Sequence, residues 1–160
     1  MTQPVLKVFL KDGAKLPAYA HVGDSGLDLA VRTPLVLRPF RRVTVDTGVH
    51  VEIPAGFEAH VRPRSGGNKR GLHVAFGTVD GPYRGPIGVT LYWMPELDFG
   101  FDGYLRVRSG EPQALEFAAG DRVAQLVIAP VAIVKVEQVQ SLAELSETER
   151  GEAGWGSSGR

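Results

Sequence analysis

Glycine and proline interrupt most of this sequence at short intervals, which disfavours long helices. The chain has 20 Gly and 11 Pro among 160 residues, and both are unfavourable inside a helix. The intervening pieces are rich in Val, Leu and Ile, and several alternate apolar with polar residues, which is typical of half-buried strands. We therefore predict an all-β sandwich, jelly roll or barrel with little helix, and strands at residues 5–10, 27–31, 42–46, 50–53, 57–62, 87–91 and 122–136.

Length and composition limit the class of protein. A chain of 160 residues with 43% hydrophobic residues suffices for one domain with a core and is short for two. Lys plus Arg equals Asp plus Glu at 18 each, so we expect neither nucleic acid nor a membrane as a partner. The absence of cysteine excludes disulfides, a thiolate nucleophile and Cys-based zinc sites. Residues 1–13 resemble neither a signal peptide nor a membrane span, and we expect a cytoplasmic protein.

The C-terminal residues differ in composition from the rest of the chain. Residues 150–160 hold four glycines and one large apolar side chain, so they cannot build a core and are expected to form a flexible arm. Upstream, Ser141 and Glu144 have the spacing of a capping box, which predicts either a turn of helix or a solvated connector within residues 141–149. We therefore divide the chain into a β domain at residues 1–149 and an arm at residues 150–160.

Two stretches in the first half of the chain carry charged groups that plain strands and turns do not require. Asp28 lies between two leucines, and an acid there is either exposed on a polar face or held by a partner. The sequence RPRSGG at residues 62–67 combines two guanidinium groups, a hydroxyl and flexible backbone, which are the donors that a phosphate site needs. A polar turn would use the same residue types.

Three further stretches complete the set of candidate sites. The sequence GTVDGPYRG predicts a hairpin with Asp80, Tyr83 and Arg84 at its tip, although the turn itself requires neither Tyr83 nor Arg84. Gln125 interrupts an apolar strand and needs hydrogen-bond partners if it is buried. The C-terminal arm offers a cation, an aromatic ring and small hydroxyl donors, which suit closure over a nucleotide.

Taken in order, these five stretches resemble the five motifs of the homotrimeric dUTPase family, and they cover residues 24–159. The arm has the form Arg-Gly-x-x-Gly-aromatic-Gly-Ser-Ser-Gly, and no shared structural demand would make unrelated β proteins repeat all five. The resemblance implies a jelly-roll or β-clip-type distorted barrel, in a trimer whose active sites are shared between chains and whose arms cross to a neighbour. It also implies dUTP diphosphatase activity, the Mg²⁺-dependent hydrolysis of dUTP to dUMP and pyrophosphate, which supports dTMP synthesis and keeps uracil out of DNA.

The resemblance assigns roles to individual residues. Asp80 would orient and deprotonate the water that attacks the α-phosphorus. Tyr83 would pack beneath the deoxyribose and exclude a 2′-hydroxyl, while backbone groups from Gly77, Val79 and their neighbours would read uracil. Asp28 would lie outside the phosphates, bonded to arginines and to water around Mg²⁺. No side chain would bind the metal directly, because Mg²⁺ would be held by phosphates and water.

The triphosphate contacts come from two further groups of residues. The α- and β-phosphates would be bound by Arg64, Ser65, Gly66 and Gln125. The arm would contribute an aromatic ring stacked on uracil and a set of γ-phosphate donors that bind when it closes, from Arg150, Trp155, Gly156, Ser157 and Ser158. The four histidines have no metal-like spacing and receive no catalytic role.

The chain departs from the family pattern in two places. The segment before Asp80 is about three residues shorter, and Ala75 and Phe76 stand where the family usually has Asn-Ser-Pro, so a polar side chain near the base is missing. Residues from about 92 to 116 are inserted. We predict an extra hairpin, which is either a surface elaboration without a catalytic role or a contact for the arm or a partner through the aromatic residues Trp93, Phe99, Phe101 and Tyr104.

Three rival interpretations are weaker. The dCTP deaminases share the fold and the trimer, but they carry a glutamate directly after the motif-three aromatic, where this chain has Arg84. A noncatalytic regulatory relative would not need the water-orienting carboxylate of Asp80. A jelly-roll module that binds sugar or peptide would explain the strands but none of the five motifs.

Overall fold

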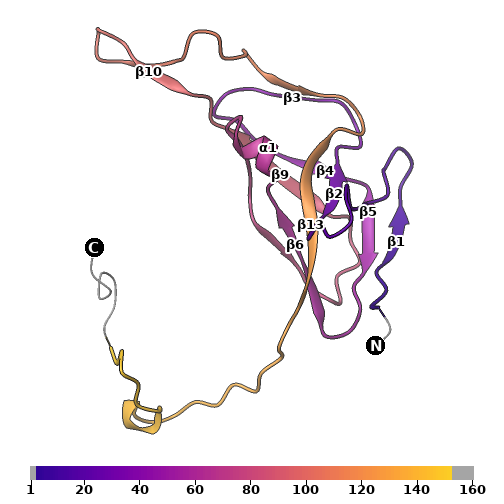
Figure 1. Cartoon of the computed structure of the whole chain (residues 1–160), viewed down its shortest axis with the longest axis vertical. Coiled ribbons are helices and arrows are strands. Elements are labelled where there is room, and N and C mark those ends of the chain that lie inside the picture. The colour runs from indigo at the N-terminus through magenta and orange to yellow at the C-terminus, as the bar shows by residue number, and fades with distance from the viewer. Residues whose placement is uncertain (1–2, 153–160) are drawn as a thin grey trace.

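The computed structural model describes residues 3–152, and most of the regular structure in that range is β (Figure 1). A single-turn helix, α1 (Ser65–Asn68), and a 3₁₀ turn, η1 (Leu142–Glu144), accompany the strands. The strands are β1 (Lys7–Leu10), β2 (Leu27–Ala30), β3 (Leu35–Leu37), β4 (Arg42–Asp46), β5 (Val49–Glu52), β6 (Phe57–Arg62), β7 (Leu72–Val74), β8 (Gly77–Val79), β9 (Gly88–Trp93), β10 (Leu97–Phe99), β11 (Leu105–Val107), β12 (Leu115–Phe117) and β13 (Arg122–Pro130).

The strands form small antiparallel sheets around one core. The largest sheet has the order β2-β13-β6-β8, a second has the order β4-β9-β7, and β1-β5, β3-β12 and β10-β11 form pairs. Leu126 of the first sheet and Leu91 of the second are both fully buried in the same apolar cluster, so the two larger sheets pack on a shared core. Burial of one such leucine contributes about 2 kcal/mol. The all-β prediction is confirmed.

The long strand predicted at residues 122–136 ends early. β13 stops at Pro130, and residues 131–152 leave the sheets as the orange and yellow segment of Figure 1. Ile133, Val134 and Val136 are strongly exposed. The alternation in this segment is that of a strand, but within residues 3–152 no other strand pairs with it, and a strand forms only with a pairing partner.

The hairpin predicted at residues 77–85 is not a hairpin. β8 pairs with β6, whereas β9 pairs with β4 and β7, so the turn between β8 and β9 connects two different sheets. Between the two strands, Ile87 donates its backbone N–H to the Val49 carbonyl of β5, at 2.8 Å. Turn chemistry predicted the reversal correctly, but it could not say which strands pair.

The inserted segment does contain an extra hairpin. β10 and β11 pair with Leu97 opposite Val107 and Phe99 opposite Leu105. The insertion is narrower than predicted, however, because Trp93 continues β9 and is fully buried. Farther along the chain, the backbone of Ser141 and the carboxylate of Glu144 form the predicted capping box before η1.

Candidate active site

Asp28 is held between two arginines. Its Oδ1 lies 2.8 Å from Nε of Arg64, and its Oδ2 lies 3.0 Å from Nη1 of Arg122. The Asp28 side chain is 15% exposed, so the alternative of a solvent-facing acid is excluded. Asp28 lies in β2 opposite Gln125 of β13, and this pairing also places Arg122 beside it. The Asp28 carboxylate thereby orients the guanidinium of Arg64, which precedes Ser65 and Gly66.

Gln125 joins the same cluster through its amide. Its Nε2 donates to the Pro63 carbonyl at 2.8 Å, which ties β13 to the residue just before Arg64. A Cβ at Gly26, just before β2, would overlap the Gln125 side chain, so a larger residue there would displace the amide. Gln125 is therefore a partly buried amide whose Nε2 has a hydrogen-bond acceptor, at the edge of the predicted phosphate site.

Ser65 and Gly66 lie on the single turn α1 and are exposed. A Cβ at Gly66 would meet no atom within 4 Å, so the space above this backbone is open to a ligand. The far end of the turn is anchored by Trp93, whose Nε1 donates to the Arg70 carbonyl at 3.1 Å. The sequence interpretation missed this role of Trp93, although apolar alternation continues through β9 and could have revealed a buried position.

Asp80 and Tyr83 line a separate cavity of about 220 Å³, together with Gly77 and Val79. The backbone N–H of Tyr83 donates to the Asp80 carbonyl at 3.0 Å, which closes the turn. The Tyr83 hydroxyl donates to the Pro86 carbonyl at 3.1 Å. The ring is 45% exposed, so it forms an accessible wall of the cavity.

Within one chain, the residues around Asp28 and Arg64 lie apart from the cavity that Asp80 lines. Ala59 pairs with Val79, so Asp80 lies level with the Phe57 end of β6, whereas Arg64 follows the other end in an extended conformation (φ −95°, ψ 142°). Six extended residues span about 20 Å. Asp80 and Arg64 therefore lie at opposite ends of β6 within one chain.

The predicted arm residues lie at the end of the described range or beyond it. Arg150 lies in a turn in which the Gly151 N–H donates to the Thr148 carbonyl at 3.1 Å, on the segment that leaves the sheets. The remaining predicted arm residues, Trp155, Gly156, Ser157 and Ser158, lie outside the described residues. Within residues 3–152, no group of three or more His, Asp or Glu side chains could hold a metal ion, and no helix is long and apolar enough to span a membrane.

Comparison with known proteins decides the family. The family model described as dUTPase matches residues 12–107 and 109–159. This chain belongs to the dUTPase family. The family resemblance predicted from the five motifs is thus confirmed, over nearly the whole length of the chain.

Curated relatives and solved structures agree with this assignment. The deoxyuridine 5′-triphosphate nucleotidohydrolase of Clostridium tetani is 37% identical, with all of both sequences covered. Its counterpart from Beijerinckia indica is 44% identical, over 92% of this chain and 85% of that protein. A mutant dUTPase of Staphylococcus bacteriophage 80alpha, solved with dUpNHpp, has a TM-score of 0.81 and 28% identity, with 98% and 99% of the two chains covered. A mutant dUTPase of phage phi11 of S. aureus has a TM-score of 0.70 and 27% identity, over 86% of this chain and 98% of that one, and is reported to show the coordination of a structural Mg(II) ion.

Proposed function

We propose that this dUTPase family member hydrolyses dUTP to dUMP and pyrophosphate. The observation that carries the proposal is the cavity in which the carboxylate-bearing residue Asp80 and the ring of Tyr83 lie together beside strand β8. The names of the curated relatives support the same substrate.

Uracil would be read by the backbone of β8. This strand is the last in its sheet order, so its outer edge has no strand partner within the described residues. Backbone N–H and C=O groups at such an edge are fixed donors and acceptors. Gly77 and Val79 would supply them, and the exocyclic amine of cytosine would mismatch that pattern. Polar mismatch in a built site discriminates strongly.

Tyr83 would select deoxyribose by shape. Its hydroxyl is already bonded to Pro86, and a Cβ at Gly85 would overlap that hydroxyl, so the ring is held close to its own turn. A ring fixed beneath the sugar leaves no room for a 2′-hydroxyl. Asp80 would hold the attacking water in line with the departing pyrophosphate and accept its proton.

The phosphates would be bound at the opposite end of β6. Arg64, oriented by Asp28, would contact the α- and β-phosphates together with Ser65, Gly66 and Gln125. Both oxygens of Asp28 already accept bonds from guanidinium groups, so Asp28 fits a position behind the substrate better than direct ligation of Mg²⁺. When bound, Mg²⁺ neutralises the charge that develops on the phosphate oxygens, and it would be held by phosphates and water.

We also propose that the active site is shared in a homotrimer. The separation of Asp80 from Arg64 by the length of β6 prevents one chain from offering both to one α-phosphate, so a neighbouring chain would supply the second cluster. The exposed apolar side chains of residues 131–136 support an arm that begins after Pro130, earlier than residue 150, and packs on a neighbour. Arg150 and the tail with Trp155, Gly156, Ser157 and Ser158 would then close over the nucleotide. A cytoplasmic location stays a prediction, which cell fractionation would test.

Product analysis tests the proposed function. Purified protein with Mg²⁺ is incubated separately with dUTP, dCTP, dTTP and UTP, and pyrophosphate and ammonia are measured. Pyrophosphate from dUTP alone is expected, and the Asp80→Ala variant purified in the same way controls for contaminating hydrolases. Ammonia from dCTP would support the deaminase interpretation, and no product from any of the four would support a noncatalytic relative.

A further inference from the structure

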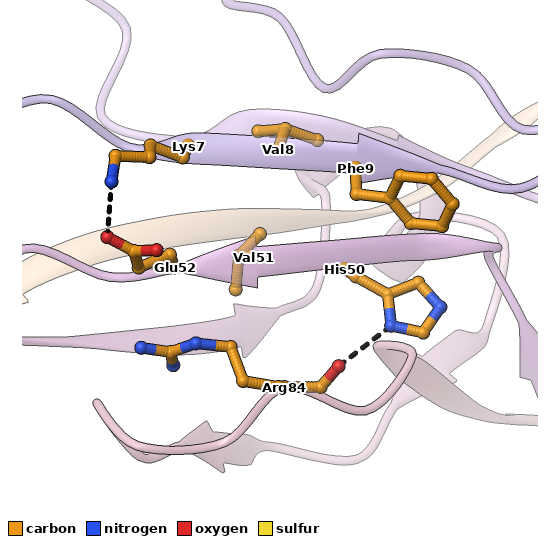
Figure 2. Close-up of a pocket in the computed structure, with 7 residues that line it drawn as sticks. All are labelled: Lys7, Val8, Phe9, His50, Val51, Glu52 and Arg84. Carbon is orange, nitrogen blue, oxygen red and sulfur yellow. Dashed lines mark hydrogen bonds and ion pairs between the residues drawn. The ribbon is translucent and has the colours of Figure 1, made fainter.

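The turn that carries Asp80 and Tyr83 is hydrogen-bonded to His50 of β5. Nδ1 of His50 lies 2.8 Å from the carbonyl oxygen of Arg84 (Figure 2). A carbonyl oxygen can only accept a hydrogen bond, so Nδ1 is the nitrogen that donates. In the neutral ring, Nε2 then carries no proton. Nε2 is buried without a hydrogen-bond partner, so in this tautomer it is an unsatisfied acceptor and not an unsatisfied N–H.

The imidazole ring is held in place by the strand pairing. Phe9 of β1 lies directly opposite His50 in the register, and the two rings make an edge contact with centroids 5.5 Å apart and an interplanar angle of 64°. Both residues line a cavity of about 320 Å³. At the other end of this cavity, Lys7 and Glu52 form an ion pair at 2.7 Å (Figure 2), and the charge of Arg84 also acts on Glu52.

The Arg84 side chain forms further hydrogen bonds within the turn, so a bond to the Arg84 carbonyl also restrains the neighbouring residues. Nη1 of Arg84 donates to the carbonyl oxygens of Gly81 and Tyr83, at 2.6 and 2.8 Å. The peptide that follows Tyr83 is thus tied to the turn by the Arg84 side chain, while the next carbonyl is tied to β5 by His50. A displacement of the Arg84 carbonyl would therefore move the backbone of Tyr83 as well.

We infer that His50 is a positioning residue that sets the place of Tyr83 and thereby the preference for deoxyribose over ribose. The inference rests on the proposed function. His50 does not contact the cavity beside β8, so it acts through the Arg84 carbonyl alone. An error of about 1 Å in a positioned group is enough to change rates substantially, and exclusion of one hydroxyl depends on a similar displacement.

A matched pair of variants tests this inference. In His50→Asn, the side-chain Nδ2 is attached to Cγ as Nδ1 is, so a donor remains near the Arg84 carbonyl, whereas His50→Leu has a similar size and no donor. We expect His50→Leu to lower kcat/KM for dUTP about fivefold to tenfold, as the loss of one hydrogen bond implies, and to raise the ratio of UTP to dUTP turnover by a similar factor. His50→Asn should keep both within about twofold of the wild type.

The turnover ratio separates positioning from a merely structural role. A variant that is only partly folded loses activity toward both nucleotides in proportion, so its ratio is unchanged. Asp102→Asn, on the exposed hairpin β10–β11, is the control and should keep the wild-type ratio. If His50→Leu does not fold, His50→Ala replaces it. A wild-type ratio in the variant that lacks the donor, or an altered ratio in His50→Asn, would overturn the inference.

Amide hydrogen exchange of the free protein gives a readout that needs no substrate. Exchange across residues 80–87 should be faster in His50→Leu than in the wild type, His50→Asn and Asp102→Asn. Unchanged exchange in His50→Leu would also contradict the inference that His50 holds the turn in place. If the wild type fails to hydrolyse dUTP, the proposed function is wrong, and the exchange comparison still decides whether His50 holds the turn.

Discussion

Replacing Asp28 by asparagine should affect the phosphate site more than the fold. The substitution keeps the size of the side chain but replaces one acceptor oxygen by an NH₂ group that faces a guanidinium. The wild type has charge-assisted bonds at 2.8 Å to Arg64 and 3.0 Å to Arg122. Each is worth about 1.5–3 kcal/mol when well buried, but the Arg64 and Arg122 side chains are 31% and 55% exposed, which moves both values toward those of surface pairs.

We therefore expect Asp28→Asn to lower the free energy of unfolding by about 1–3 kcal/mol in total. For a chain of this size that corresponds to a fall in Tm of roughly 3–10 °C. Because Arg64 is no longer oriented, kcat/KM for dUTP should fall by about 10² or more. Calorimetry and steady-state kinetics at 25 °C measure the two effects.

Asp102→Asn is the matched control for this prediction. Asp102 also pairs with an arginine, Arg106, but on the exposed hairpin β10–β11 with a side chain that is 43% exposed. Such an i,i+4 pair contributes about 0.5 kcal/mol or less, so Tm and kcat/KM should barely change. If Asp28→Asn behaves like this control in both measurements, the two ion pairs do not orient Arg64, and the account of the phosphate site is wrong.

Three further predictions concern the water-orienting acid, the acid stability and the arm. Asp80→Ala should lower turnover at least about 10²-fold and leave the affinity for dUpNHpp within about tenfold by calorimetry; unchanged turnover would remove Asp80 from the mechanism. The backbone N–H of Gly48, followed by the charges of Arg32 and Lys11, lowers the pKa of Asp46 below its ordinary value. Asp46 thus stabilises the fold above about pH 4 and loses this contribution as the pH falls through its lowered pKa. In Asp46→Asn the free energy of unfolding should therefore fall less steeply below pH 5 than in the wild type, as urea titrations at several pH values would measure. Truncation after Thr148 should preserve the proposed trimer in light scattering and lower turnover sharply, whereas truncation after Pro130 should abolish that trimer.

Local patterns were sufficient for much of the fold and for the chemical types in the site. The strands at residues 42–46 and 57–62 were predicted with their observed bounds, because their alternation extends over five or six residues. Strands of three residues, such as β3 and β7, are too short to show a period. Arg122 was not assigned to the site because its contact with Asp28 depends on the pairing of β2 with β13, which no local pattern specifies.

Two independent features support the proposed homotrimer. The first is chemical, because the groups for the nucleoside and for the phosphates lie at opposite ends of β6. The second is energetic, because residues 131–136 expose Ile133, Val134 and Val136, which could stabilise an interface by about 1.5–3 kcal/mol each if buried. Ordering that segment costs about 1–2 kcal/mol for each residue, which roughly offsets the gain from its side chains, so backbone pairing with a neighbour would supply the net stabilisation. A neighbour that supplies this pairing is also available to complete the active site, which is why assembly and turnover should be lost together when the segment is removed.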